Sequence, residues 1–288
     1  MNNDHQTPGG EMDTVGKESS KSNGGDNIAS LFELKDELEV KEERAGLRRG
    51  IYLLPNSVTT GALFSGFYAI IAAMSGSYEN AAIAIVVAGF LDALDGRVAR
   101  MTNTQSEFGV QYDSLSDMVA FGVAPAVLMF SWVLSGLGKI GWVIAFLYMA
   151  CAALRLARFN TKPENRVFFG LNSPMAAGLL AAMVWVWSEH LGSVPDIEVR
   201  VPMALLTAML ALLMVSNVPY FSPKKLNTQK RSPFFHMLGV IVIFAFVAAN
   251  PPVALLILGI TYAASGPIQA LMKNKKAAQD TADSKKID

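Results

Sequence analysis

The sequence predicts an all-α, polytopic integral membrane helix bundle with about eight transmembrane helices. Of the 288 residues, 52% are hydrophobic and 17% are charged, whereas soluble domains carry about 25% charged residues. The apolar residues come in blocks of roughly 20, the length that an α-helix needs to cross a bilayer. The single cysteine, Cys151, lies inside one of these blocks. Neither a disulfide framework nor a cysteine zinc cluster can therefore hold the fold together.

The N-terminal region is polar and is predicted to lie outside the membrane. Residues 1–40 contain nine Asp or Glu and three Lys, and a cleavable signal peptide would instead need a basic start and an apolar run. This composition is typical of a disordered acidic tail. Residues 41–54 read KEERAGLRRGIYLL. This mixture of charged and apolar positions predicts a juxtamembrane interfacial helix on an anionic membrane surface.

Eight apolar segments follow, and together they predict a transmembrane domain over residues 55–272 and a C-terminal tail over 273–288. The last two segments are separated by Pro251-Pro252 and could form a helical hairpin rather than two full spans. The expected spans are 55–75, 81–101, 110–134, 139–158, 172–191, 201–219, 234–249 and 252–272.

The basic residues predict the orientation of these spans. With the N-terminus in the cytoplasm, 17 Lys or Arg residues flank the inner ends, and only Lys139 and Arg200 lie in the outer loops. Cytoplasmic loops are enriched in Lys and Arg, so both termini are expected in the cytoplasm and the chain in the inner (cytoplasmic) membrane. Lys+Arg and Asp+Glu both count 24, which argues against a nucleic-acid partner, because such binders usually carry a basic excess.

Four aspartates stand where a membrane helix rarely has charge. Asp92 and Asp95 lie near the inner end of the second span, and Asp113 and Asp117 lie in the first turns of the third. An ionised Asp in the bilayer core costs about 2.5–3.5 kcal/mol, so four of them require compensation. The two arginines nearby are too few to neutralise four carboxylates. One or two divalent cations would neutralise the group.

The spacing of these aspartates places them on facing helix surfaces. Asp113 and Asp117 are four residues apart, and Asp92 and Asp95 are three apart, so each pair lies on one face of its helix. Two antiparallel neighbours can turn these faces toward each other. The resulting set of oxygen ligands suits Mg²⁺ or Mn²⁺. Two other readings stay open: a structural polar cluster, and the site of a membrane cation carrier, although transporter sites lie nearer the bilayer midplane.

These residues belong to a longer pattern that is similar to a known family signature. Residues 92–117 read D-x-x-D-G-x-x-A-R-x8-G-x3-D-x3-D, which resembles the signature of the CDP-alcohol phosphatidyltransferases. The resemblance implies a polytopic enzyme that joins an alcohol to the phosphatidyl group of a CDP-activated membrane lipid and releases CMP. It also implies a divalent metal cofactor, with two Mg²⁺ or Mn²⁺ ions expected, and a homodimer.

Three further stretches resemble the branch of this family whose acceptor is serine. Residues 55–60 read PNSVTT, residues 154–160 read LRLARFN, and residues 169–174 read FGLNSP, with Asn172 where that branch is expected to have Pro. The expected substrates are therefore CDP-diacylglycerol and L-serine. The same chemistry with glycerol 3-phosphate or inositol as acceptor remains an alternative.

The resemblance also implies roles for individual residues. Asp92, Asp95 and Asp113 would be metal ligands, and Asp117 would both bind metal and act as the base that accepts the serine hydroxyl proton. The residues expected to bind the CDP-lipid are Gly96, Ala99 and Gly109 around the nucleotide, Arg100 on a phosphate, and Asn56 and Thr59 near the diphosphate. Asn56 could equally be the cap of the first span.

The end of the fourth span offers candidates for binding the acceptor. Arg155 and Arg158 are three residues apart and could hold the serine carboxylate, with Asn160 beside them. They could also be anchors whose side chains reach the lipid phosphates. Ser173 and Pro174 are expected in a loop that closes over the acceptor.

Overall fold

The computed structural model describes residues 56–102, 106–161, 170–192, 195–218, Tyr220 and 247–284. All regular elements in this part of the chain are helices, which confirms the all-α class. The acidic tail expected over 1–40, the interfacial helix expected over 41–54 and most of the expected span 234–249 lie outside the described residues.

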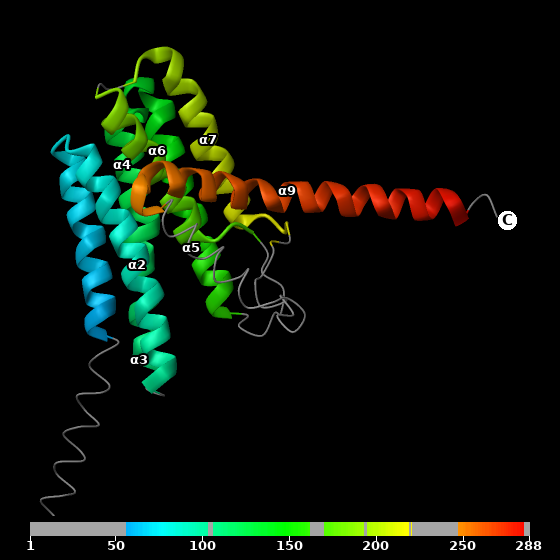
Figure 1. Ribbon diagram of the computed structural model, residues 1–288, viewed down its shortest axis with the longest axis horizontal. Coiled ribbons are helices and arrows are strands. Elements are labelled where there is room, and N and C mark those ends of the chain that lie inside the picture. The colour runs from blue at the N-terminus through cyan, green and yellow to red at the C-terminus, as the bar shows by residue number, and fades with distance from the viewer. Residues whose placement is uncertain are drawn as a thin grey trace, which may run out of the picture. The chain divides into compact units, whose positions relative to one another are not determined.

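The helices coincide with the apolar segments. The first described helix is Asn56–Met74, drawn in blue in Figure 1. The α-helices that follow are α2 (Tyr78–Thr102), α3 (Glu107–Asp117), α4 (Ala124–Trp132), α5 (Lys139–Thr161), α6 (Ser173–His190), α7 (Ile197–Val215) and α9 (Pro251–Ser284). The helical backbone of α9 thus continues beyond residue 272, where the last span was expected to end.

The third expected span contains a π-helical turn. α3, the π-helix η1 (Met118–Val123) and α4 follow one another without a break, and a 3-10 turn, η2 (Leu134–Leu137), comes after α4. The backbone N–H of Ala124 donates to the carbonyl of Val119, five residues back. Pro125 follows directly, and because it has no N–H it cannot continue an α-helical ladder. π-turns of this kind are rare and often stand at functional sites.

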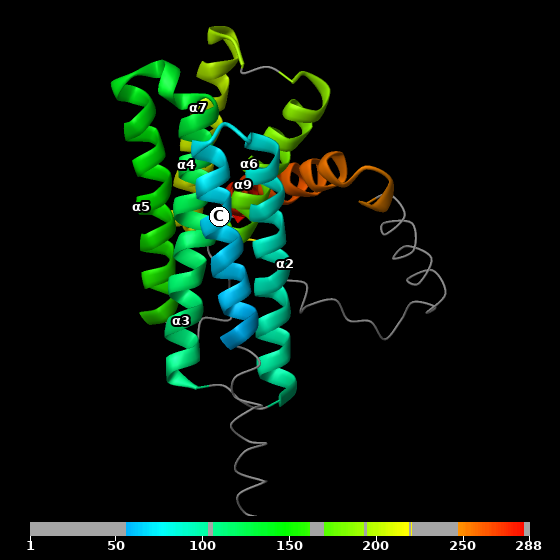
Figure 2. The same ribbon diagram turned by 90° about the vertical axis from the view of Figure 1, so that its left-hand side faces the viewer.

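The helices pack through small side chains. α2 packs against α6, α5 against α7 and α6 against α9, and α9 runs across the other long helices rather than along them (Figures 1 and 2). Alanines such as Ala81, Ala88 and Ala177 are fully buried. Small residues let helix backbones approach closely, which is how helices associate in membranes.

Gly66 shows how tight this packing is. A Cβ built on Gly66 would lie 2.8 Å from the Cα of Ala120, closer than two carbon atoms can approach. Glycine is therefore required where the Asn56–Met74 helix crosses η1. This contact fixes the first helix against the segment that follows Asp117.

The outer faces of the helices are apolar, as contact with lipid requires. Large side chains such as Phe64, Phe90, Trp142 and Leu205 are more than half exposed. Five of the described helices are long and apolar enough to cross a membrane, so the chain is a multi-pass membrane protein. They are Asn56–Met74, Glu107–Trp132, Lys139–Thr161, Ile197–Val215 and Pro251–Gln269.

The expected number of eight spans is not reproduced in the described residues. α2 and α6 occupy the second and fifth expected spans but are not among the five. In α2 the reason is the charged C-terminal half, which carries Asp92, Asp95 and two arginines.

Candidate functional site

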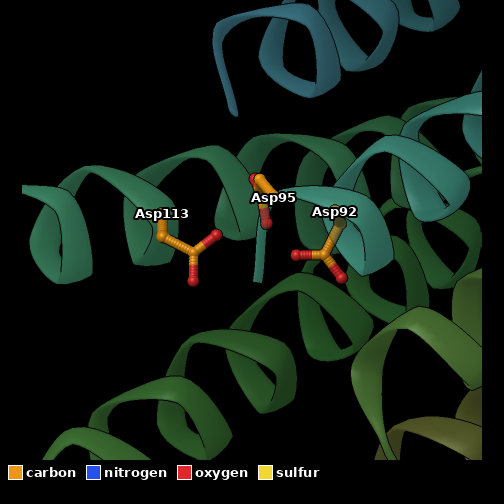
Figure 3. Close-up of side chains that lie close together, drawn as sticks. All are labelled: Asp92, Asp95 and Asp113. Atoms are coloured by element: carbon orange, nitrogen blue, oxygen red, sulfur yellow. The ribbon is translucent and has the colours of Figure 1, made fainter. Parts of the chain in front are cut away.

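Three aspartates come together between α2 and α3. Asp92 and Asp95 lie on α2, Asp113 lies on α3, and one carboxylate oxygen from each lies within 4.8 Å of the other two. Figure 3 shows the three side chains close together, with the Asp92 and Asp113 carboxyl groups turned toward each other. Asp95 is buried and the other two are half-buried. Like charges this close disfavour ionisation of one another unless a cation joins them, and carboxylate oxygens are the ligands that hard divalent cations prefer. The three residues fit a metal ion.

Asp117 adds a fourth carboxyl group at the edge of this cluster. It is the last residue of α3, one turn after Asp113, and its side chain lies within hydrogen-bonding reach of Asp92. The structure thus brings all four sequence-predicted aspartates into one site.

The Asn56–Met74 helix supports the cluster from one side. The Thr59 hydroxyl donates to Oδ2 of Asp95 at 2.8 Å, and both side chains are buried. Ser116 of α3 in turn donates to the backbone carbonyl of Thr59 at 3.2 Å. A carboxylate held in this way keeps one orientation, as metal-ligating carboxylates usually do.

The residues expected to bind the nucleotide differ in the space around them. A Cβ on Gly96 would meet nothing within 4 Å, whereas one on Gly109 would meet the Ser106 hydroxyl at 3.1 Å and the Asn56 side-chain oxygen at 3.4 Å. Arg100 is exposed, and its Nε donates to the carbonyl of Gly96 at 2.8 Å. Ala99 lies on α2 between Gly96 and Arg100, and its side chain is not among those that the structure describes.

The candidates on α5 have three different sets of partners. Arg155 faces the carboxylates, since its guanidinium interacts electrostatically with Asp117, and its Nη1 donates to Ser173 Oγ at 3.3 Å. Arg158 is exposed and donates to Asn217 at 2.9 Å. Asn160 donates to Ser114 of α3 at 3.1 Å.

Ser173 and Pro174 were expected in a loop, and this prediction is wrong. Ser173 is the first residue of α6, and Pro174 follows within the first turn. Proline is favoured there because its missing N–H is not needed at the start of a helix. The Ser173 side chain is 1% exposed and contacts Arg155, so it lines the site from a fixed position.

The sequence patterns did not point to Ser116 or to Tyr262. Ser116 could have been found because it lies between two of the aspartates on α3. Tyr262 lies on α9 and interacts electrostatically with Arg155. No spacing rule connects two residues so far apart in the chain, and the packing of α9 on α6 is a contact between distant segments.

Comparisons with known proteins agree with this site. A family model for CDP-alcohol phosphatidyltransferase matches residues 52–245, a range that contains all four aspartates. Each of the following relatives is called a CDP-diacylglycerol–serine O-phosphatidyltransferase. The chain is 37% identical to one from Helicobacter pylori over 182 residues, covering 62% of this chain and 75% of the relative.

Relatives with the same name from two other organisms are also similar to this chain. The chain is 35% identical to a relative from Mycobacterium leprae, over 69% of this chain and 67% of the relative. It is 33% identical to one from Methanocaldococcus jannaschii, over 77% of this chain and 96% of the relative. With the family model spanning more than half of its residues, the chain belongs to the CDP-alcohol phosphatidyltransferase family.

Proposed function

We propose that this protein transfers the phosphatidyl group of CDP-diacylglycerol to the hydroxyl of L-serine, giving phosphatidylserine and CMP. The observation that carries the proposal is the cluster of Asp92, Asp95 and Asp113 in a chain whose relatives are named for this reaction. The family membership places the activity among phosphotransferases that act on CDP-activated lipids.

The carboxylates would hold the metal that the reaction needs. Asp92, Asp95 and Asp113 are the proposed ligands, and Asp117 would share in binding because it contacts Asp92. Two divalent cations, Mg²⁺ or Mn²⁺, would neutralise the diphosphate and stabilise the departing CMP. Thr59, expected near the diphosphate, would act mainly by fixing Asp95.

The CDP-lipid would occupy the open side of α2 and α3. The space beside Gly96 can admit a nucleotide against the backbone, with Ala99 and Gly109 adding little bulk. Arg100 is exposed and can offer its guanidinium nitrogens to a phosphate. Asn56 lies next to Gly109 and could contact the same diphosphate.

Asp117 is the proposed general base. Its side chain is within hydrogen-bonding reach of Asp92 and interacts electrostatically with Arg155, so it could meet an acceptor bound by Arg155. Asp117 would take the serine hydroxyl proton as the serine oxygen attacks the phosphorus that bears diacylglycerol. A new phosphorus–oxygen bond forms, and the bond to the CMP oxygen breaks. We favour this single in-line displacement over a phosphatidyl-enzyme intermediate.

Arg155 is the proposed partner of the serine carboxylate. A guanidinium can pair with a carboxylate through two parallel hydrogen bonds, and Arg155 is directed toward Asp117. Arg158 and Asn160 lie farther along α5 and are exposed. They would contact serine on its way into the site.

The proposal includes the membrane arrangement and the assembly. The excess of basic residues on one side of the spans supports a site and both termini on the cytoplasmic side of the inner membrane. The domains would be the 1–40 tail, the 41–54 interfacial helix, the catalytic region over 55–272 and the 273–288 tail. We also propose a homodimer, as the family resemblance implies.

The test is an acceptor panel with the purified full chain in detergent or nanodiscs. CMP release from CDP-diacylglycerol is measured with L-serine, glycerol 3-phosphate or inositol, before and after chelation of metal. Serine alone should give rapid, metal-dependent release and labelled phosphatidylserine. Release with glycerol 3-phosphate but not serine would overturn the acceptor, and ion flux in vesicles without CMP release would favour a carrier.

A further inference from the structure

Side-chain hydrogen bonds join the Asn56–Met74 helix to α3 next to the carboxylate cluster. The Thr60 hydroxyl lies 2.9 Å from the Tyr112 hydroxyl and donates to the backbone carbonyl of Asn56 at 2.7 Å. A hydroxyl has one hydrogen to donate. Because the hydrogen of Thr60 goes to Asn56, Tyr112 is the donor to Thr60. Two consecutive hydrogen bonds therefore run from α3 to the first turn of the Asn56–Met74 helix.

The bond from Tyr112 is the part of this chain that crosses between helices. A threonine hydroxyl in a helix often bonds the carbonyl four residues back, as Thr60 does, and that contact stays within one helix. Tyr112 and Thr60 are 52 positions apart in the sequence. The Tyr112 ring also stacks on Phe108, with centroids 5.9 Å apart and 12° between the ring planes. This stacking favours one orientation of the phenol.

Asn56, at the end of the hydrogen-bond chain, lies against a part of α3 that has no side chain. A Cβ built on Gly109 would be 3.4 Å from the Asn56 side-chain oxygen. Farther along α3, the Ser116 hydroxyl donates to the Thr59 carbonyl at 3.2 Å. Gly109, Tyr112 and Ser116 are three and four residues apart, so they lie on one face of α3. All of this face meets the start of the Asn56–Met74 helix.

We propose that Tyr112 is a positioning residue for the CDP-lipid: acting through Thr60, its hydroxyl keeps the Asn56 amide group where it can donate to the diphosphate. The inference rests on the proposed function and deepens it, because the pattern over 92–117 leaves position 112 unspecified. An amide carries two N–H donors, which phosphate oxygens can accept. In this role Tyr112 touches no reacting atom, and its effect is separate from metal binding by its neighbour Asp113.

The test compares Tyr112→Phe with the wild-type full chain in detergent or nanodiscs. This variant keeps the ring beside Phe108 and removes only the hydroxyl. The KM for CDP-diacylglycerol should rise roughly three- to tenfold, the effect of losing one neutral hydrogen bond. The kcat, the KM for L-serine and the half-saturating Mg²⁺ concentration should change less than about twofold. Tyr78→Phe is the matched control, because it loses a hydroxyl that donates to the Ser131 carbonyl at 3.0 Å and should leave all four quantities unchanged.

Variants of Thr60 test whether the effect passes through this residue. Thr60→Val removes the intermediate hydroxyl and should raise the KM for CDP-diacylglycerol at least as much as Tyr112→Phe does. Adding Tyr112→Phe to Thr60→Val should have less than about a twofold further effect, because the two hydroxyls act in one chain. Thr60→Ser restores a hydroxyl and should return this KM close to wild type. Effects that multiply in the double variant would mean that the two residues act independently, and the inference would then be wrong.

Two soluble probes show which part of the CDP-lipid is affected. CDP keeps the diphosphate and lacks the lipid, whereas cytidine lacks both phosphates. As inhibitors against CDP-diacylglycerol, CDP should weaken in Tyr112→Phe in parallel with the substrate, and cytidine should not. Equal weakening of both probes would mean that the whole nucleotide space is disturbed, which contradicts a role at the diphosphate.

The outcomes distinguish this inference from the proposed function. If the wild type releases no CMP with serine, the proposed function fails. If the wild type is active and Tyr112→Phe leaves the KM for CDP-diacylglycerol unchanged, only the role of Tyr112 fails. A lower unfolding midpoint with that KM unchanged would show that the bond merely joins two helices. A rise in the half-saturating Mg²⁺ concentration instead would show that Tyr112 acts on Asp113, and it would also refute the proposed role.

Discussion

The hydrogen bond from Thr59 to Asp95 gives the sharpest prediction about the metal site. Thr59→Val keeps the shape of the side chain and removes the hydroxyl that lies 2.8 Å from Oδ2 of Asp95. Both residues are buried, at 4% and 5% exposure, so water cannot easily replace the lost donor. A hydrogen bond to a charged group contributes about 1.5–3 kcal/mol, and at about 1.4 kcal/mol per factor of ten the affinity for metal should fall roughly 10- to 100-fold.

The assay is CMP release measured across a range of Mg²⁺ or Mn²⁺ concentrations. The half-saturating metal concentration should rise by that factor in Thr59→Val and return close to wild type in Thr59→Ser, which restores a hydroxyl. Activity at saturating metal should change much less, because Asp95 itself is intact. Thr207→Val is the control, since Thr207 is equally buried but donates to Met203 within α7.

Two results would contradict this reasoning. A half-saturating concentration within twofold of wild type in Thr59→Val would mean that Asp95 does not depend on this donor for metal binding. An equal shift in Thr207→Val would mean that the loss reflects the general stability of the bundle rather than the orientation of one carboxylate.

The remaining predictions concern the base, the nucleotide space, the helix contact and the metal. Asp117→Asn should lower kcat about 10²- to 10⁴-fold, the usual contribution of a general base. The affinity for CDP-diacylglycerol, measured by equilibrium titration, should change less than fivefold. Full activity in this variant would exclude Asp117 as the base. Gly96→Leu fills open space and should raise the KM for CDP-diacylglycerol at least tenfold without lowering the unfolding temperature. Gly178 also faces open space, and the control variant Gly178→Leu should leave that KM unchanged. Gly66→Ala should overpack against Ala120 and destabilise the fold by about 1–3 kcal/mol, which a lower unfolding midpoint would show. In the control variant Gly61→Ala, the new methyl group meets only Leu91 at 3.5 Å, so the unfolding midpoint should hardly change. Chelation of metal should abolish CMP release, and either Mg²⁺ or Mn²⁺ should restore it; activity that survives chelation would contradict the assignment of the carboxylates.

The sequence predicted the site best where spacing along one helix decides the geometry. Asp92 with Asp95, and Asp113 with Asp117, must share a helix face at those separations, and a short connection makes the two helices neighbours. The same reasoning fails for Arg155 and Arg158. They are three residues apart, yet Arg155 reaches Ser173 at the start of α6 and Arg158 reaches Asn217 just beyond the end of α7.

Contacts between distant segments could not be predicted from the sequence. Nothing in the spacing of Thr59 or Ser116 shows that Thr59 donates to Asp95, or that Ser116 donates to the backbone carbonyl of Thr59. Ser173 and Pro174 were expected in a loop over the acceptor, although proline is well suited to begin a helix. The π-turn after Asp117 was also missed, since hydrophobic periodicity over 110–134 is too uniform to reveal one extra residue in a turn.

That wide turn has a consequence for how the enzyme tolerates change. A π-helical turn takes up an additional residue, so the segment on its far side, α4, is rotated relative to α3. If η1 kept all its residues but rewound to 3.6 residues per turn, the residue that the wide turn absorbs would rotate α4 by roughly 100° about its axis, and Trp132 and Leu128 would leave their buried places. Lipid-facing positions of this span can vary freely, but a change that forces the segment between Asp117 and Pro125 into regular α-helix at unchanged length should cost the protein its fold before it costs the chemistry.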